Sequence, residues 1–174
     1  QDYDLYSIRA DHQFTAKDTF MARYSLNDAG NFSPNTFPGY GTLDNQRQMA
    51  GTVSYTRIIG PTTLNEFRFG YTRFAEYQAP ENTIAGNNIV QKLGISGLES
   101  ANSPAIVGAP TFTIGGFATV GDGGGPFRPR NNSFQFMDQV SFHPGRHSIK
   151  VGGEIRRTRM AIVNASTSRG SFDF

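Results

Sequence analysis

The sequence predicts an all-β fold built as an antiparallel meander of about six strands, and three observations support this. The 174 residues include 15 Phe, 7 Tyr, 20 Gly and 9 Pro but no Trp, and only 17% are charged, which is typical of an aromatic, turn-rich chain. Apolar and polar residues alternate with a period of two in six segments. The connections between these segments are alternately short and long.

The alternating segments form three predicted hairpins, at about residues 5–27, 47–74 and 133–159. In the first, Ile8 and Ala10 alternate with Ser7 and Arg9, so that one face is apolar and the other polar. Short segments rich in turn-forming residues join the strands of each hairpin: residues 15–18, Gly60-Pro61 and Pro144-Gly145.

Two long irregular segments, residues 28–45 and 75–130, separate the hairpins, and the second is too long for a plain connection in a compact soluble domain. Outer-membrane β-barrels combine short turns at one end with long loops at the other. Their strands are about 10 residues long and alternate an apolar outer face with a polar interior. The pattern therefore predicts that the chain is part of a large transmembrane outer-membrane β-barrel.

Facing assignments follow from the alternation. Aromatic side chains beside the short turns suit the girdle of a membrane interface, and the lipid-facing aromatics are expected to be Phe14, Phe20, Tyr55, Phe67, Phe69 and Phe142. Charged side chains are costly against lipid, so the residues expected to face the lumen are Arg9, Asp11, Arg23, Glu66, Arg68, Lys150, Glu154 and Arg156. Strict alternation puts Asp138 on the apolar side, and a β-bulge or register slip is expected there.

Several function classes are disfavoured. The absence of cysteine removes thiol chemistry, and no apolar run is long enough for a membrane-spanning helix. A net charge of +2 without a basic stripe argues against nucleic acid as a partner. His12, His143 and His147 lack metal-ligand spacing, and the Gly121–Gly125 run lacks the lysine of a phosphate-binding loop and is expected to be a flexible external loop. We therefore expect no enzyme activity, no metal and no cofactor.

Four segments carry a resemblance to a known family. These segments are RADHQFTAKD (9–18), PTTLNEFRFGYTRF (61–74), LGISGL (93–98) and GRHSIKVGGE (145–154). Taken together and in this order, they resemble the barrel of Oar-like TonB-dependent receptors. In that family a carboxypeptidase-regulatory-like domain often lies upstream of the barrel. The resemblance implies an outer-membrane receptor that captures a nutrient with its external loops and imports it by plug movement driven through TonB.

The same resemblance implies partners that this segment lacks: a plug, the remaining barrel strands, the TonB complex and an unidentified ligand. Outer-membrane lipid or lipopolysaccharide is a further expected partner, and the candidate residues for contact with anionic lipopolysaccharide or substrate are Arg128, Arg130, Arg156, Arg157 and Arg159, although exposed charges at strand ends are the commoner case. About six strands are too few for a plugged barrel of about 22 strands, so the chain is expected to be a partial barrel spanning residues 1–174. Gly170-Ser171-Phe172 is interpreted as the start of another strand, although Phe172 and Phe174 also suit the aromatic end of a final one.

Two alternatives from other classes stay open at this point. One is a soluble β-sandwich binding module, for example for carbohydrate, in which the aromatic residues would form the core between two sheets. The other is a surface adhesin or structural barrel without a plug. The identity of the ligand and the number of strands in the parent barrel do not follow from the sequence.

Overall fold

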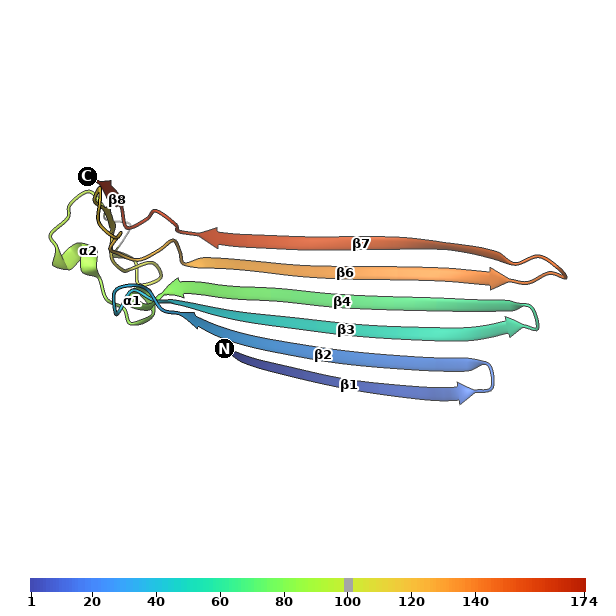
Figure 1. Cartoon of the computed structure of the whole chain (residues 1–174). Coiled ribbons are helices and arrows are strands. Elements are labelled where there is room, and N and C mark those ends of the chain that lie inside the picture. The colour runs from blue at the N-terminus through green and yellow to red at the C-terminus, as the bar shows by residue number, and fades with distance from the viewer. Residues whose placement is uncertain (99–101) are drawn as a thin grey trace.

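The computed structural model describes residues 1–98 and 102–174, and its main feature is one long antiparallel sheet with a folded loop region at one end (Figure 1). The sheet order is β1-β2-β3-β4-β6-β7, which is the order of these strands along the chain. The strands are β1 (Asp2–Thr15), β2 (Asp18–Ser33), β3 (Thr42–Gly60), β4 (Thr63–Pro80), β6 (Phe127–Phe142) and β7 (Ile149–Asn164).

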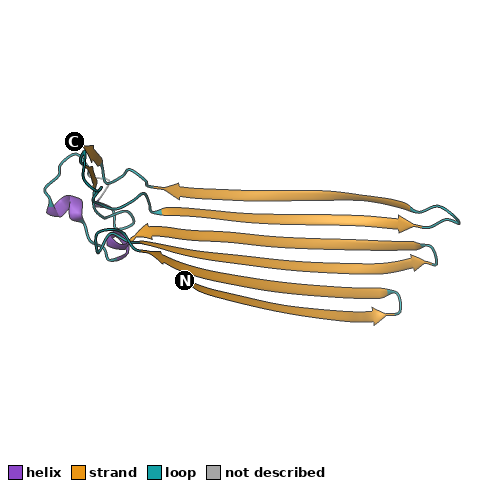
Figure 2. Ribbon diagram, viewed as in Figure 1, coloured by secondary structure: helices purple, strands orange, loops and turns teal. Residues whose placement is uncertain are grey.

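Short turns join the strands at one end of the sheet, as the sequence predicts (Figure 2). At the first turn the Thr15 hydroxyl donates to the Asp18 carboxylate at 2.6 Å and accepts from the backbone N–H of Lys17 at 3.1 Å. This arrangement suits the preference of Asp and Thr for turns. The pairing register shifts only beside short turns, between Gln13 and Thr15 and between Ile58 and Gly60.

The strands extend beyond the predicted hairpins at their loop ends. β2 runs on to Ser33 and β3 begins at Thr42, so residues 34–41 are all that separates them, whereas the sequence predicts an irregular segment from 28 to 45. Likewise β4 continues to Pro80 and β6 begins at Phe127. In these extensions the side chains of both faces are largely polar, so the alternation that identifies a strand is weak.

The connections at the other end fold together into a compact unit, which we call the loop cap (residues 34–41, 81–98, 102–126 and 165–174). It contains the one-turn helices α1 (Glu81–Ile84) and α2 (Ile89–Lys92), and the short strands β5 (Thr111–Thr113) and β8 (Ser171–Asp173). β5 and β8 pair in parallel as a separate two-stranded sheet. The strand predicted to start near Ser171 therefore exists, but it belongs to the loop cap instead of continuing the long sheet.

The buried apolar residues belong to the loop cap or the strand end beside it: Ala79, Val90, Val107 and Ala109. The long sheet is a single layer, and apolar side chains such as Ile8 and Ile155 remain 70% and 72% exposed. In the described part of the chain, the only other sheet is the small β5–β8 pair at the end of the long one, so the two packed sheets of a sandwich are missing. The β-sandwich alternative is therefore wrong.

No helix in residues 1–98 or 102–174 has the length and apolar character needed to cross a membrane.

Two glycines permit the close packing of the loop cap. Gly121 has a φ of +126°, and a Cβ there would lie 2.1 Å from the carbonyl oxygen of Pro110. A Cβ on Gly108 would lie 2.2 Å from Oδ2 of Asp122. The segment 121–126 is thus folded tightly against its neighbours, with Asp122 and Pro126 buried, and the prediction of a flexible loop there is wrong.

We predict that Gly121→Ala destabilises the loop cap by about 1–3 kcal/mol, because alanine is strained at this φ and its methyl group collides with backbone. Limited proteolysis of the folded protein should show faster cleavage within residues 81–126. Gly123→Ala is the matched control, since its Cβ would meet no atom within 4 Å. Equal protease resistance of the two variants would contradict the tight packing at Gly121.

Candidate functional site

The pairing register separates the long sheet into two faces of opposite character. Ala22, Val53, Phe69, Phe136 and Ile155 lie in register across successive strands and share what we call the apolar face. One residue further along each strand, the side chains point to the opposite, polar face. All six predicted lipid-facing aromatics share the apolar face, and all eight predicted lumen-facing charges lie on the polar face.

Aromatic contacts link neighbouring strands across the apolar face. The ring centroids of Phe69 and Phe136 are 4.9 Å apart, and those of Tyr71 and Phe134 are 5.0 Å apart. Phe14, beside the register shift of β1, lies 6.2 Å from Phe20. Such cross-strand aromatic pairs contribute to sheet stability and fix the register.

The apolar residues form a band that runs obliquely across the strands. On β2 the band extends from Phe20 to Leu26, and on β7 from Ile149 to Ile155. Across the intervening strands, Phe20 is in register with Gly153, which lies four residues beyond Ile149, the start of the band on β7. Over the four steps from β2 to β7, both edges of the band therefore shift by four residues toward the short turns. At about 3.4 Å per residue and 4.8 Å per strand, this is a tilt of about 35°. Strands of outer-membrane barrels are tilted by about 35–45° relative to the membrane normal.

Asp138 interrupts the band on β6, and the structure shows no bulge there. The register of β6 with β4 and β7 is continuous, so Asp138 remains on the apolar face between Phe67 and Gly153. Its carboxylate accepts a hydrogen bond of 2.7 Å from the side-chain amide of Asn65. The expectation of a bulge or register slip at Asp138 is therefore wrong, and a polar partner on the neighbouring strand accommodates the carboxylate instead.

Charged side chains on the polar face pair mainly along their own strands. Arg9 donates two hydrogen bonds of 2.7 Å to Asp11, and Arg156 lies 3.2 Å from Glu154. Arg68 and Glu66 form a third such pair, and Gln139 of β6 donates to the same glutamate across the strand boundary. The sequence permits ion-pair ladders between strands, but the structure places these three ion pairs within strands. Apart from Glu66, whose side chain is 16% exposed, the paired side chains are exposed, so these pairs contribute little stability and give the face a polar surface of alternating charge.

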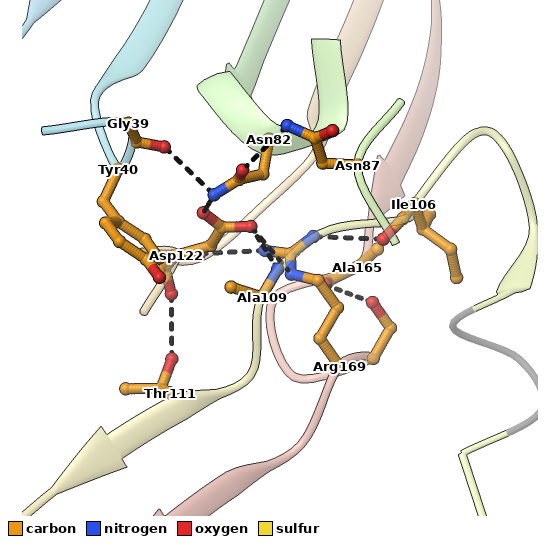
Figure 3. A network of polar contacts seen from close by, with 12 residues as sticks. Gly39, Tyr40, Asn82, Asn87, Ile106, Ala109, Thr111, Asp122, Ala165 and Arg169 are labelled. Carbon is orange, nitrogen blue, oxygen red and sulfur yellow. Dashed lines mark hydrogen bonds and ion pairs between the residues drawn. The ribbon is translucent and has the colours of Figure 1, made fainter. Parts of the chain in front are cut away.

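A buried carboxylate organises the loop cap. Asp122 is 1% exposed, and its two carboxylate oxygens accept hydrogen bonds from the side chain of Asn82 at 2.9 Å and the backbone N–H of Ala109 at 2.7 Å (Figure 3). Its backbone carbonyl accepts from the Thr111 hydroxyl at 2.8 Å. Asn82 also donates to the carbonyl of Gly39 at 3.0 Å. Asp122 thus links α1 to β5, and Asn82 extends the network to the β2–β3 loop.

Arg169 brings the C-terminal segment into the same network. Its guanidinium is 3.7 Å from the Asp122 carboxylate and donates to the carbonyls of Ile106 at 3.2 Å and Gly123 at 2.9 Å. Burial lowers the pKa of Arg169 below its ordinary value, and the charge of Asp122 opposes this shift. Both side chains are almost fully inaccessible to solvent, so each depends on the other for charge compensation.

The sequence gives only a partial signal for this pair. An aspartate inside a glycine run is unusual, but nothing in the local pattern indicates that Asp122 pairs with an arginine 47 positions later. The histidines have plain roles: His12 packs edge-on against Phe14 at 4.5 Å, while His143 and His147 make backbone hydrogen bonds near the last turn. Among residues 1–98 and 102–174, no three His, Asp or Glu side chains are grouped in a way that could hold a metal ion.

Comparison with known proteins gives one match that covers the whole chain. A family model described as an outer membrane beta barrel domain matches residues 1–174. A search of curated proteins found no match. The match agrees with the meander topology, the two-faced sheet and the tilt of the apolar band, and it places the protein in the outer membrane. We infer that the apolar face is the face toward lipid, because charged side chains are costly in hydrocarbon.

We predict that Val53→Arg impairs assembly into the outer membrane, because an arginine at the centre of the lipid face costs about 2–4 kcal/mol. Thr52→Arg is the matched control, since residue 52 lies on the polar face of the same strand. The amount of heat-modifiable, folded protein in outer-membrane fractions measures the effect. Similar defects in both variants would argue against the facing assignment.

For the loop cap, we predict that Asp122→Ala costs about 3–5 kcal/mol of local stability, because it leaves the Arg169 guanidinium buried without its counter-charge. The double variant Asp122→Leu with Arg169→Met should be less damaging than Asp122→Ala, because it removes both charges. Hydrogen exchange of residues 102–126 in the folded barrel measures the opening of the loop cap.

The control for this experiment is Asp173→Ala, which removes an exposed carboxylate of β8 that forms no ion pair within the described residues. We expect hydrogen exchange in this variant to match that of the unaltered protein. Identical exchange in the Asp122→Ala variant would show that the buried pair does not hold the loop cap together.

Proposed function

Starting from the premise that this chain belongs to the family of outer membrane β-barrel domains, we propose that it is the membrane-spanning part of a TonB-dependent receptor. In this proposal the barrel imports a nutrient that is too large or too scarce for open porins. External loops capture the ligand, and energy transmitted by TonB rearranges a plug inside the barrel. The proposal gives the chain no catalytic role and no cofactor.

The observation that carries the proposal is the folded loop cap at one end of the sheet only. The short turns at the opposite end leave no comparable surface (Figure 1). Loops held on a rigid scaffold are the usual place for recognition, and a loop cap fixed by the Asp122–Arg169 pair loses less entropy when it binds a ligand than a mobile loop would.

The polar face supports the same proposal from the other side of the sheet. Its side chains offer charges of both signs and hydroxyl groups along the strands, including Ser7 and Ser25, whose hydroxyls are hydrogen-bonded to each other at 3.1 Å. A surface of this kind suits contact with water and with a folded plug in the lumen. The resemblance to Oar-like receptors in four separate segments adds the specific suggestion of TonB dependence.

The proposal is tested with the purified full-length protein that contains these 174 residues. We expect the protein to bind the periplasmic C-terminal domain of TonB saturably and to show no steady conductance in planar lipid bilayers, because a plug closes the lumen. The Asp122→Ala variant is a control that should alter the loop cap and leave TonB binding unchanged. A large steady conductance without TonB binding would overturn the proposal, and a closed barrel without TonB binding would favour an adhesin or structural barrel.

A further inference from the structure

Four arginines on the apolar face have no counter-charge in the described part of the chain. They lie at the loop-side edge of the apolar band, and we call them the arginine cluster: Arg73 on β4, Arg130 on β6, and Arg157 and Arg159 on β7. None of them forms an ion pair with a described residue, whereas Arg47 on the same face is paired with Asp28 through hydrogen bonds of 2.6 and 2.9 Å.

The spacing within the arginine cluster suits a ligand with more than one phosphate. Arg73 and Arg159 are both in register with Asn132, which places them two strand spacings apart, about 10 Å. Arg157 and Arg159 are two residues apart on one strand, about 7 Å. Asn132 accepts a hydrogen bond from the Tyr71 hydroxyl at 2.9 Å, which leaves its amide N–H groups available as donors. Guanidinium groups bind phosphate oxygens bidentately, so such a row matches phosphates better than isolated lysines would.

An apolar groove lies next to the arginine cluster on the side toward the middle of the membrane. It has a volume of about 590 Å³, and small residues such as Ala22 and Gly51 contribute to its lining, between Tyr24 and Tyr71. A Cβ built on Gly51 would meet no atom within 4 Å, so the groove is open at this point. Arg73 follows Tyr71 on the same face, two residues closer to the loop cap. A groove of this shape accommodates an acyl chain beneath a phosphate held by Arg73.

A polar cleft lies on the other side of the arginine cluster, toward the loop cap. Its volume is about 740 Å³, and both signs of charge line it: Asp2, Asp4 and Asp28 on β1 and β2, and Arg47, Arg128 and Arg130 on β3 and β6. Arg128 lies 4.5 Å above the ring of Tyr77, and its Nε atom is buried without a hydrogen-bond partner. Hydroxyl-rich sugars, which donate and accept hydrogen bonds, suit a cleft with both kinds of charged group.

We propose that this surface is a binding site for lipopolysaccharide of the outer leaflet. The order along the sheet is apolar groove, arginine cluster and polar cleft, which matches acyl chains, phosphates and core sugars in turn. A phospholipid would fill the first two zones and leave the cleft empty, so the three zones together favour the glycolipid. The inference rests on the proposed function in one respect, namely that the loop cap faces the outside of the cell.

The test measures binding of purified lipid A and of lipopolysaccharide to the detergent-solubilised, delipidated protein. Each basic residue at a membrane surface contributes a factor of about five in affinity, so we expect the triple variant Arg73→Gln, Arg157→Gln and Arg159→Gln to bind about a hundredfold more weakly. Arg9→Gln is the matched control, because Arg9 is an exposed arginine on the polar face that lines neither the groove nor the cleft. Gly51→Leu, which fills the groove, should weaken binding of lipid A several-fold while the phosphate contacts remain.

The proposal is overturned if the triple variant binds lipid A as tightly as the Arg9→Gln control, or if dephosphorylated lipid A binds as tightly as the phosphorylated form. Orientation is checked separately, using the absence of cysteine among these 174 residues and a background in which any cysteine elsewhere in the protein is replaced by serine. In intact cells a membrane-impermeant maleimide should label Thr119→Cys in the loop cap and spare Lys17→Cys at the first turn. Labelling of Lys17→Cys instead would place the arginine cluster in the inner leaflet and exclude lipopolysaccharide. Failure to bind TonB would overturn only the transport proposal and leave this site unaffected.

Discussion

The long sheet is a single layer, and its apolar side chains have no protein interior in which to be buried. Residues such as Ile8, Val151 and Ile155 are each at least 67% exposed in the chain itself. In water this arrangement would leave a broad apolar surface unburied, and the open edges of β1 and β7 would present unpaired backbone groups. A bilayer accepts the apolar face, and closure of the sheet into a barrel satisfies the edges, because backbone groups in hydrocarbon must all be hydrogen-bonded.

The loop cap obeys a different constraint, because it is folded outside the apolar band. It has a small core around Val90, Val107 and Ala109, and its long irregular segments contain many backbone groups that need partners. The buried network supplies several of these partners: the Asp122 carboxylate accepts from one backbone N–H, and the Asn82 amide and the Arg169 guanidinium donate to three backbone carbonyls. The sheet thus depends on its lipid solvent, while the loop cap depends on a buried ion pair and on glycines that allow close backbone approach.

The sequence predicts the sheet better than the loop cap, for a physical reason. A strand with one face toward lipid and the other toward water must alternate, and residues 5–27, 47–74 and 133–159 show this directly. Beyond the apolar band the alternation fades, as at Asp28 and Asn31, so the ends of the strands cannot be identified from the pattern. Asp138 could be placed on the apolar face by alternation, but its partner Asn65 could not, because that contact is 73 residues away. The same distance in sequence hides the pairing of Asp122 with Arg169.

The tilt of the apolar band explains why the arginine cluster forms a compact group although its members come from three strands. The loop-side edge of the band falls after Leu26 on β2, after Tyr71 on β4 and after Ile155 on β7. Relative to the pairing register, a plane parallel to the membrane therefore crosses β7 four residues closer to the short turns than it crosses β2. Arg73 and Arg157 are the first residues beyond that edge on the apolar face of their strands. Tilted strands therefore bring them to a similar depth, where phosphate groups of the lipid lie, and a cluster that is staggered in the sequence becomes a single row at the membrane surface.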